Sequence, residues 1–314
     1  TISVHLGEHP AIRGFAATIV ILLAISAALR MLCRGAKSNF YATDGMVCVA
    51  LSWLILSLAG SLPFLFSGAI PRFIDALFEI VSGFTTTGAS ILPAVEGLPK
   101  GILYWRSFSH WVGGMGVLVF LLAIVPSGDR GKGFTMHLLR AESPGPSVGK
   151  LVPRMRKTAA ILYILYVILT VANILFLLLG GMPAFEAVCN AFGTAGTGGF
   201  GVRNDSFASY SPYLQNVTTV FMFLFGVNFS CYYLLLIGQV RSVLKDEELR
   251  AYFGIAFVSI ALIAWNIRSL YGTLGETLRH AAFQVSSIMT TSGFATTDFD
   301  LWPSFSKTIL LVLM

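Results

Sequence analysis

The chain has 314 residues, of which 55% are hydrophobic and 11% charged, and its formal net charge is +6. A soluble domain usually has about 25% charged residues, so this composition argues against an ordinary soluble enzyme or binding domain. The positive charge does not indicate a nucleic-acid partner, because the basic residues concentrate between apolar runs, as the positive-inside bias requires. We therefore expect an all-α polytopic membrane protein embedded in a lipid bilayer.

Apolar runs long enough to cross about 30 Å of hydrocarbon as a helix follow one another along the chain. The six expected spans are 15–33, 47–66, 103–125, 159–179, 214–237 and 251–267. A seventh begins near Leu301 and is cut off at Met314. No Ala-x-Ala-like cleavage site follows the first run, and more spans come behind it, so it is a membrane helix and not a signal peptide.

The charge of the connecting segments orients the chain. Segment 127–158 has seven Lys and Arg against two acidic residues, whereas 67–101 has two against three. The positive-inside rule therefore places 127–158 in the cytoplasm. Counting spans from there puts segments 67–101, 181–213 and 268–300 outside, together with the N-terminus. An outward N-terminus without a signal sequence predicts at least one earlier span.

The three outer segments share one anatomy, which makes them internal repeats. A span arrives, then a short amphiphilic stretch (75–84, 186–195 or 280–289), then a Thr/Ser/Gly-rich turn and the next span. The turns align without gaps on Gly88, Gly199 and Gly293. Each copy then has an alanine twelve positions before the glycine, a side chain with a carbonyl nine before, and a threonine two before. In chain order these are Ala76, Ala187 and Ala281; Glu79, Asn190 and Gln284; Thr86, Thr197 and Thr291.

The chemistry of these turns suits a cation. A stretch of about ten residues is too short to span a bilayer, so it predicts a re-entrant half-helix, and irregular backbone at membrane depth must be buried or line a wet path. Glycine permits positive φ, which lets successive carbonyls point one way. Rings of carbonyl and hydroxyl oxygens replace the hydration shell of a monovalent cation, and the negative C-terminal ends of the half-helices favour it. We expect a selectivity filter made of Thr86, Thr87, Gly88, Thr197, Gly198, Gly199, Thr291, Ser292 and Gly293, with no transition metal.

The order span, pore helix, filter, span, repeated in one chain, resembles the superfamily of K+ transporters that includes the bacterial Trk and Ktr membrane subunits. One glycine per filter fits this family, and not the fuller Thr-Val-Gly-Tyr-Gly of tetrameric potassium channels. The likeness covers essentially the whole chain. It includes 98–100, 104–106 and 111–116 after the first filter, and the cytoplasmic string 141–146 (Ala-Glu-Ser-Pro-Gly-Pro), which resembles a motif of the Trk branch. Asn228 and Tyr232, late in the fifth span, lie where that branch has a polar interruption.

The resemblance implies a K+ uptake protein of the bacterial inner membrane, not an enzyme, with repeated helix–pore helix–filter–helix units around a central pore and the filter loops outside. It implies K+ as the transported ion, no cofactor in this chain, a homodimer, and gating by a cytoplasmic nucleotide-binding regulatory subunit (TrkA/KtrA-like). The expected parts are an N-terminal helix and connector (1–45), pore repeat 1 (46–130), a cytoplasmic loop with pore repeat 2 (131–240) and pore repeat 3 (241–314). The family has four repeats, so we expect a fragment that does not close a pore by itself.

Other motifs indicate alternatives. A cation symporter with a midplane site between broken helices remains the main one, although such folds often use inverted repeats and these are direct. The string His-Leu-Gly-Glu-His at 5–9 matches a zinc-protease pattern, but its glycine and the following Pro10 disfavour the required helix. The Gly-x-Gly-x-x-Gly at 196–201 follows no strand, which disfavours a dinucleotide site. Lys307 is a charge inside the seventh run that could snorkel outward.

Overall fold

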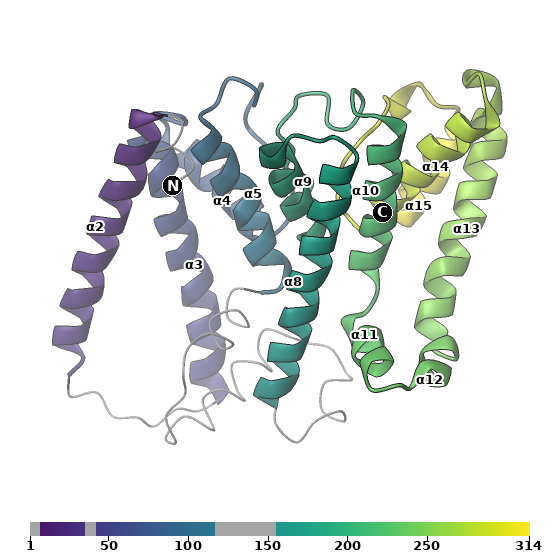
Figure 1. The fold of residues 1–314 in the computed structure, drawn as a ribbon. Helices are drawn as coiled ribbons and strands as arrows, with labels where there is room; N and C mark the ends of the chain where they lie inside the picture. Colours follow the sequence, from purple (N-terminus) through teal and green to yellow (C-terminus); the bar gives the residue numbers. More distant parts are fainter. Residues whose placement is uncertain (1–6, 35–41, 117–154) are drawn as a thin grey trace. The chain divides into compact units, whose positions relative to one another are not determined.

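The structure is a computed structural model that describes residues 7–34, 42–116 and 155–314, apart from the side chains of 42–46 and 155–159. The regular secondary structure of the described residues is helical, with no strand among them (Figure 1), which confirms the all-α prediction. The cytoplasmic string 141–146, the second half of the predicted span 103–125 and almost all of the basic segment 127–158 lie outside the described residues.

The chain divides into two compact units. The first contains Thr1–Thr85 and Ala89–Tyr163, and the second contains Thr86–Gly88 and Ile164–Met314. The short segment Thr86–Gly88, which is the first predicted filter turn, therefore groups with the second unit, although its chain neighbours belong to the first.

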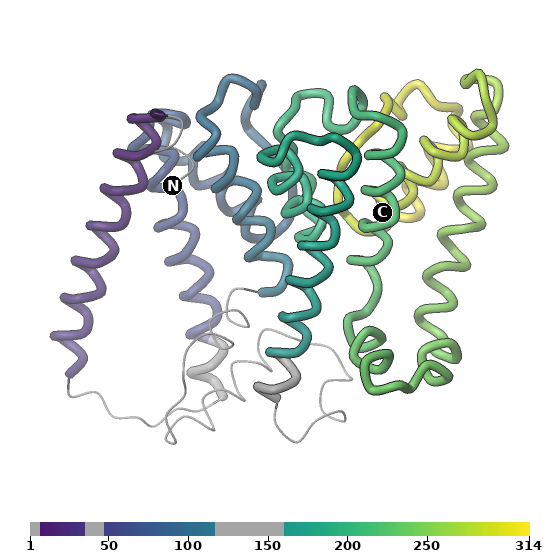
Figure 2. The backbone as a smooth tube through the Cα atoms, in the orientation of Figure 1, coloured from purple at the N-terminus to yellow at the C-terminus, as the bar shows by residue number. Residues whose placement is uncertain are grey.

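The first unit is built from three consecutive packed helix pairs (Figure 2). Its helices are α2 (His9–Leu32), α3 (Ala42–Phe66), α4 (Phe73–Phe84) and α5 (Lys100–Gly114). The pairs α2–α3, α3–α4 and α4–α5 are in contact. Gly60 allows the close approach of α3 and α4, because a Cβ there would lie 2.8 Å from Ile80 and Phe84 side-chain atoms. Small residues commonly allow such close packing of membrane helices.

Helix α2 begins six residues earlier than predicted, and the residue before it has a structural role. The Glu8 carboxylate accepts hydrogen bonds from the backbone N–H groups of Lys100 (2.6 Å) and Gly101 (3.0 Å). These N–H groups open α5 and have no partner within their own helix. Glu8 therefore serves the start of α5, whereas His5 of the same string lies outside the described residues.

The second unit contains the other elements. They are α8 (Met155–Leu179, in which the unit boundary falls), α9 (Ala184–Ala195), α10 (Pro212–Gly226), α11 (Phe229–Leu236), α12 (Val240–Leu244), α13 (Glu247–Ile267), η2 (Arg268–Leu270), α14 (Leu274–Met289), η3 (Phe299–Leu301) and α15 (Ser304–Leu313). The short helix α14 packs against both α10 and α13, and α9 packs against α10. Two short helices thus lie against longer ones, as the repeat pattern predicted.

In the described part of the chain, four helices are long and apolar enough to cross a membrane, namely α2, α3, α8 and α13. Helices α10 and α11 add a fifth span if the bent pair counts as one. The prediction of one continuous span over 214–237 is wrong, because the two helices meet at 86°. Val227 is extended, and the Asn228 side-chain oxygen Oδ1 accepts from Ser230 N–H (3.0 Å) as the N-cap of α11. The Tyr232 hydroxyl donates to the Leu224 backbone carbonyl (2.6 Å).

The three predicted half-helices are confirmed as short helices, α4, α9 and α14. Each ends at the predicted residue, which is Phe84, Ala195 or Met289. Helix α14 begins six residues earlier than predicted because the Thr273 hydroxyl accepts from Glu276 N–H (3.2 Å) as an N-cap.

Candidate functional site: three filter turns

The three filter turns, Thr86–Gly88, 197–199 and 291–293, have the same backbone conformation. Their glycines have φ values of 76°, 77° and 71°, and their leading threonines 54°, 53° and 56°. The residue between them does not have positive φ in any of the three. Each turn thus has two residues in the left-handed region, on either side of one that is not. The glycine conformation is the one that the sequence favoured, whereas positive φ at a β-branched threonine is a genuine outlier.

The filter turns lie against one another in chain order. A Cβ added at Gly88 would overlap the carbonyl oxygen of Gly198, and one added at Gly199 would overlap the carbonyl oxygen of Ser292. For Gly293, no described heavy atom lies within 4 Å of the corresponding position. Only glycine fits at these two positions. The two contacts bring predicted filter residues of all three repeats together.

Hydrogen bonds fix the direction of the peptide groups. The N–H groups of Gly198 and Ser292 donate back to the carbonyls of Gly193 (3.0 Å) and Ser287 (2.8 Å) at the ends of α9 and α14. The N–H groups of these two central filter residues are therefore used inside their own half-helices. Their carbonyls face the glycine of the preceding repeat, as the overlaps at Gly88 and Gly199 show.

We call the segment that follows each filter turn its exit limb (89–91, 200–202 and 294–297). The residue nine positions before the filter glycine supports this limb in the first repeat. In the first repeat this is Glu79, which has no exposed surface. Its carboxylate accepts from the Ser90 hydroxyl (3.0 Å), from Ile91 N–H (3.1 Å) and from Arg106 Nε, with which it forms an ion pair. Arg106 is itself 4% exposed. A charged pair inside the protein therefore fastens the first exit limb to α4 and α5.

This role was missed in the sequence. The three residues at this position were noticed as an alignment match, and Arg106 as part of the string 104–106, but nothing joined them. In the second repeat the equivalent Asn190 is also buried, and its amide donates to the Tyr210 hydroxyl (3.2 Å). The sequence feature that could have indicated this role is the recurrence of a residue with a side-chain carbonyl at the same position of all three repeats.

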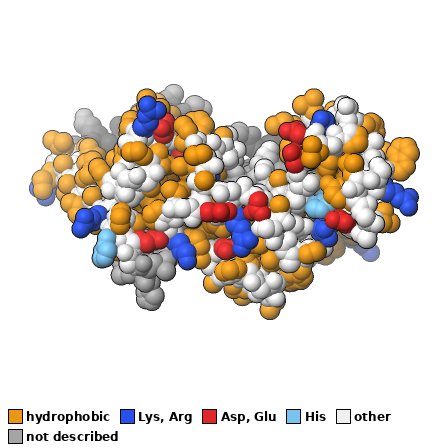
Figure 3. Space-filling view, turned by 90° about the horizontal axis from the view of Figure 1, so that it is seen from above, with side chains coloured by type: hydrophobic (Ala, Val, Ile, Leu, Met, Phe, Trp, Pro, Cys, Tyr) orange, Lys and Arg blue, Asp and Glu red, His pale blue; other side chains and the backbone are white. Residues whose placement is uncertain are grey.

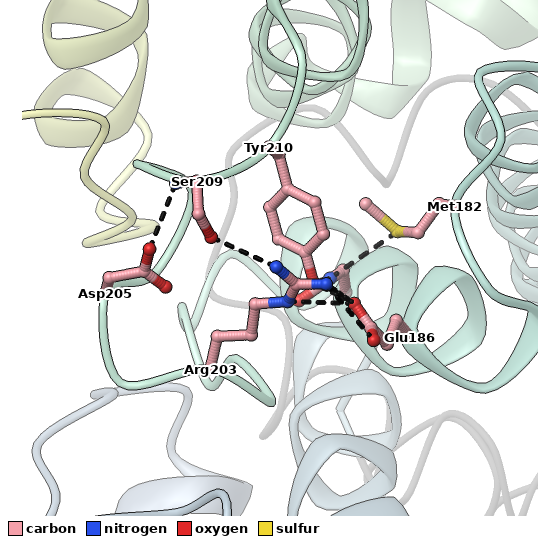
Figure 4. Close-up of polar contacts among 7 residues, drawn as sticks. Met182, Glu186, Arg203, Asp205, Ser209 and Tyr210 are labelled. Carbon is pink, nitrogen blue, oxygen red and sulfur yellow. Dashed lines mark hydrogen bonds and ion pairs between the residues drawn. The ribbon is translucent and has the colours of Figure 1, made fainter.

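A second polar cluster lies beside the second filter turn (Figure 4). Arg203 forms an ion pair with Glu186 (3.0 Å), and its guanidinium lies over the Tyr210 ring, 4.3 Å from the centroid. The Tyr210 hydroxyl donates to Glu186 (2.5 Å). Burial raises the pKa of Tyr210, and its hydrogen bond to Glu186 raises it further. Burial lowers the pKa of Arg203, but Tyr210 and Glu186 outweigh that effect and the net shift is upward.

Figure 3 looks onto the end of the molecule that carries the loops after the filters, and shows acidic and basic side chains on this face. Lys307 is exposed, and its ammonium donates to the Asp300 carbonyl (3.0 Å), so it is not an interior charge. Among the described residues, no group of three or more His, Cys, Asp or Glu side chains could hold a metal ion. The oxygen atoms at the two contacts between turns are the backbone carbonyls of Gly198 and Ser292. Carbonyl oxygens are the ligands that replace the hydration shell of a monovalent cation in selectivity filters.

The helices and turns define a polytopic membrane protein built from spans, short half-helices and irregular turns. The family model TrkH, described as cation transport protein, matches residues 11–314. The chain belongs to this family.

Similar proteins carry consistent names. The Trk system potassium uptake protein TrkH of Salmonella typhimurium is 38% identical over 306 residues, which are 95% of this chain and 62% of that protein. TrkG of Escherichia coli K12 is 33% identical over 305 residues, 95% of this chain and 62% of that protein. The crystal structure of the potassium transporter TrkH from Vibrio parahaemolyticus matches with a TM-score of 0.79 and 32% identity, over 96% of this chain and 62% of that one. This chain thus spans 62% of the length of these relatives.

Proposed function

We propose that the full-length protein takes up potassium across the bacterial inner membrane, through a pore whose selectivity filter includes the three filter turns. The observation that carries this proposal is the repeated conformation of the turns, with positive φ at both threonine and glycine, in three copies that touch in chain order. The relatives named as potassium uptake proteins support K+ as the ion.

The chemistry follows from the backbone. Carbonyl oxygens turned to one side replace the water that an ion loses on entry. The C-terminal ends of α4, α9 and α14 point their partial negative charge toward the turns that follow them. Backbone geometry matters more than side-chain identity, which is consistent with the three different central residues, Thr87, Gly198 and Ser292.

We further propose that the filter loops face outside, that the protein is a homodimer, and that a cytoplasmic nucleotide-binding regulatory subunit gates it. The relatives are named as proteins of a "Trk system", which supports a system of several components. The charge difference between segments 127–158 and 67–101 supports the orientation.

Growth of a K+-uptake-deficient bacterium on low potassium tests the main proposal. The full-length wild-type gene is expected to restore growth, and Gly88→Arg is expected to abolish the rescue while the protein still reaches the membrane. Gly97→Arg is the matched control, because Gly97 is exposed and no described atom lies within 4 Å of its Cβ position. The proposal fails if wild type gives no rescue, or if Gly88→Arg rescues as well as Gly97→Arg.

The break between α10 and α11 favours a second candidate, a cation symporter with a site between broken helices. Flux in proteoliposomes separates the two. A pore carries K+ down an imposed K+ gradient with no accompanying H+ or Na+ movement, whereas a symporter moves the coupled ion in fixed proportion.

A further inference from the structure

The loop 202–211, between the second filter turn and α10, is hydrogen-bonded to the exit limb of the third filter. Phe207 N–H donates to the Ala295 carbonyl (2.9 Å), and Ala295 N–H donates to the Ser206 hydroxyl (3.1 Å). Ala295 follows the filter glycine Gly293 by two residues. Both backbone polar groups of this exit-limb residue are therefore held by the preceding repeat.

An aromatic anchor fixes the loop at this place. Phe207 is completely buried, and its ring lies 4.9 Å from the ring of Phe294 and 5.6 Å from that of Phe283. Phe294 directly follows the third filter glycine, and Phe283 belongs to α14. The Gln215 amide donates to the Phe207 carbonyl (2.9 Å), which fastens the same residue to α10. The loop thus inserts between the third half-helix and its exit limb.

The two ends of the loop are fastened to the first turn of α9 by a cluster that we call the clasp: Glu186, Arg203 and Tyr210 (Figure 4). Glu186 binds Arg203 from one end of the loop and Tyr210 from the other. The Arg203 and Glu186 side chains are 34% and 22% exposed, so part of the clasp is in contact with solvent. Ser206 has a φ of 55°, so the loop keeps a conformation that a serine on its own disfavours.

We propose that loop 202–211 is a brace by which the second repeat sets the position of the third filter. Ser206 and Phe207 are its positioning residues, and the clasp keeps the loop in place. The effect on ion transport rests on the proposed function, whereas the coupling of the clasp to the exit limb does not. A change at the clasp therefore alters the third filter and leaves the first exit limb, which Glu79 holds, unaffected.

Hydrogen exchange measured by mass spectrometry on the full-length protein tests the coupling without any transport assay. Ser206→Gly removes the acceptor of Ala295 N–H, and glycine adopts a φ of 55° without strain. Exchange of Ala295 is expected to speed up on the order of fivefold, which corresponds to one lost hydrogen bond. Arg203→Ala is expected to speed up exchange in 203–210 and 294–297. The first exit limb, 89–91, is the internal reference and should not change.

Arg268→Ala is the matched control for charge, because it removes an exposed arginine of the same unit that is not part of the clasp. Exchange that rises equally in both exit limbs, or does not rise in 294–297, overturns the proposal. The same result with Arg268→Ala as with Arg203→Ala overturns it too.

Rb+ and Na+ uptake by cells carrying the same variants tests the positioning role. Ser206→Gly and Arg203→Ala are expected to change the ratio of Rb+ to Na+ uptake by at least threefold, and Arg203→Lys is expected to restore part of it by keeping the charge over Tyr210. Altered exchange with an unchanged ion ratio would show a structural contact only and overturn the positioning role. Absence of Rb+ uptake by wild type would instead reject the proposed function, and the exchange result would still decide the coupling.

Discussion

Replacing Glu79 by glutamine should destabilise the protein strongly, although the two side chains have nearly the same shape. The carboxylate is fully buried and pairs with Arg106, which is 4% exposed. Removing one partner of a buried ion pair typically costs about 3–5 kcal/mol, because the remaining charge stays buried without its counter-charge. The glutamine keeps one carbonyl oxygen that can still accept from Ile91 N–H, so most of the loss comes from the charge. We expect Glu79→Gln to lower the free energy of unfolding by about 3–5 kcal/mol.

Denaturant unfolding in detergent, followed by tryptophan fluorescence, gives the free-energy difference. A second variant, Glu79→Gln with Arg106→Met, removes both charges and should recover about half of the loss or more, since neutral replacements of a buried pair are often tolerated. Glu96→Gln, at an exposed position in the same outer segment, should stay within about 0.5 kcal/mol of wild type. The reasoning is refuted if Glu79→Gln behaves like Glu96→Gln, or if the double variant loses the sum of both single losses.

Four further predictions concern single positions. Gly88→Ala should lower thermal stability and growth on low K+ far more than Gly97→Ala. The added methyl group would overlap a carbonyl oxygen, and alanine at a φ of 76° costs about 1–2 kcal/mol. Equal effects of the two substitutions would contradict this prediction. Thr197→Gly relieves the strain of a threonine at a φ of 53°, so the melting temperature should stay the same or rise while K+ uptake falls. A fall of both the melting temperature and K+ uptake would argue against backbone strain that serves function. Asn228→Ala should cost about 1 kcal/mol in denaturant unfolding through loss of the α11 cap, whereas Asn228→Ser keeps a capping oxygen and should cost less. Because the pKa of Tyr210 is raised in the folded protein, the unfolded chain loses the hydroxyl proton first, and the free energy of unfolding falls as pH rises above about 10. Tyr210→Phe should make this fall less steep between pH 9 and 11. An unchanged slope would show that Tyr210 does not cause it.

The half-helices were predictable because their signals are local. The amphiphilic stretches stop where the Thr/Ser/Gly turns begin, and helices α4, α9 and α14 end at the predicted residues for that reason. Direct repetition then allowed one turn to be compared with another. The glycine φ values also follow from residue type, since glycine adopts positive φ without steric penalty.

The threonine conformation and the helix break could not be predicted in this way. Positive φ is unfavourable for a threonine by itself, so residue type does not predict it. At Thr197 and Thr291 it belongs to the cap at the end of a half-helix, in which the next N–H group, of Gly198 or Ser292, donates to the carbonyl five residues back. The apolar run 214–237 has the length and composition of one span, and a close tertiary contact accompanies its bend. A Cβ at Gly226, the last residue of α10, would overlap the Tyr252 hydroxyl of α13. The sequence of residues 214–237 alone does not predict this close contact with another helix.

The ion pairs show the same limit. Glu79 and Arg106 lie 27 residues apart, and Glu186 and Arg203 lie 17 apart. Composition and the positive-inside rule account for charges that face water, but they do not select partners for a charge that the fold buries. Only the packing of α4 against α5 identifies Arg106 as the partner of the first of these glutamates.

The contact between successive filter turns has a direction, glycine of one on carbonyl of the next. Such head-to-tail contacts use two different surfaces, as in the rings formed by heterologous assembly. In a ring of identical chains, every substitution appears at every position at once. Here the copies are tied into one polypeptide, so a gene duplication can keep the shared contact while each copy changes alone. Thr87, Gly198 and Ser292 occupy the same place in the three turns, and a substitution at one of them leaves the other two unchanged.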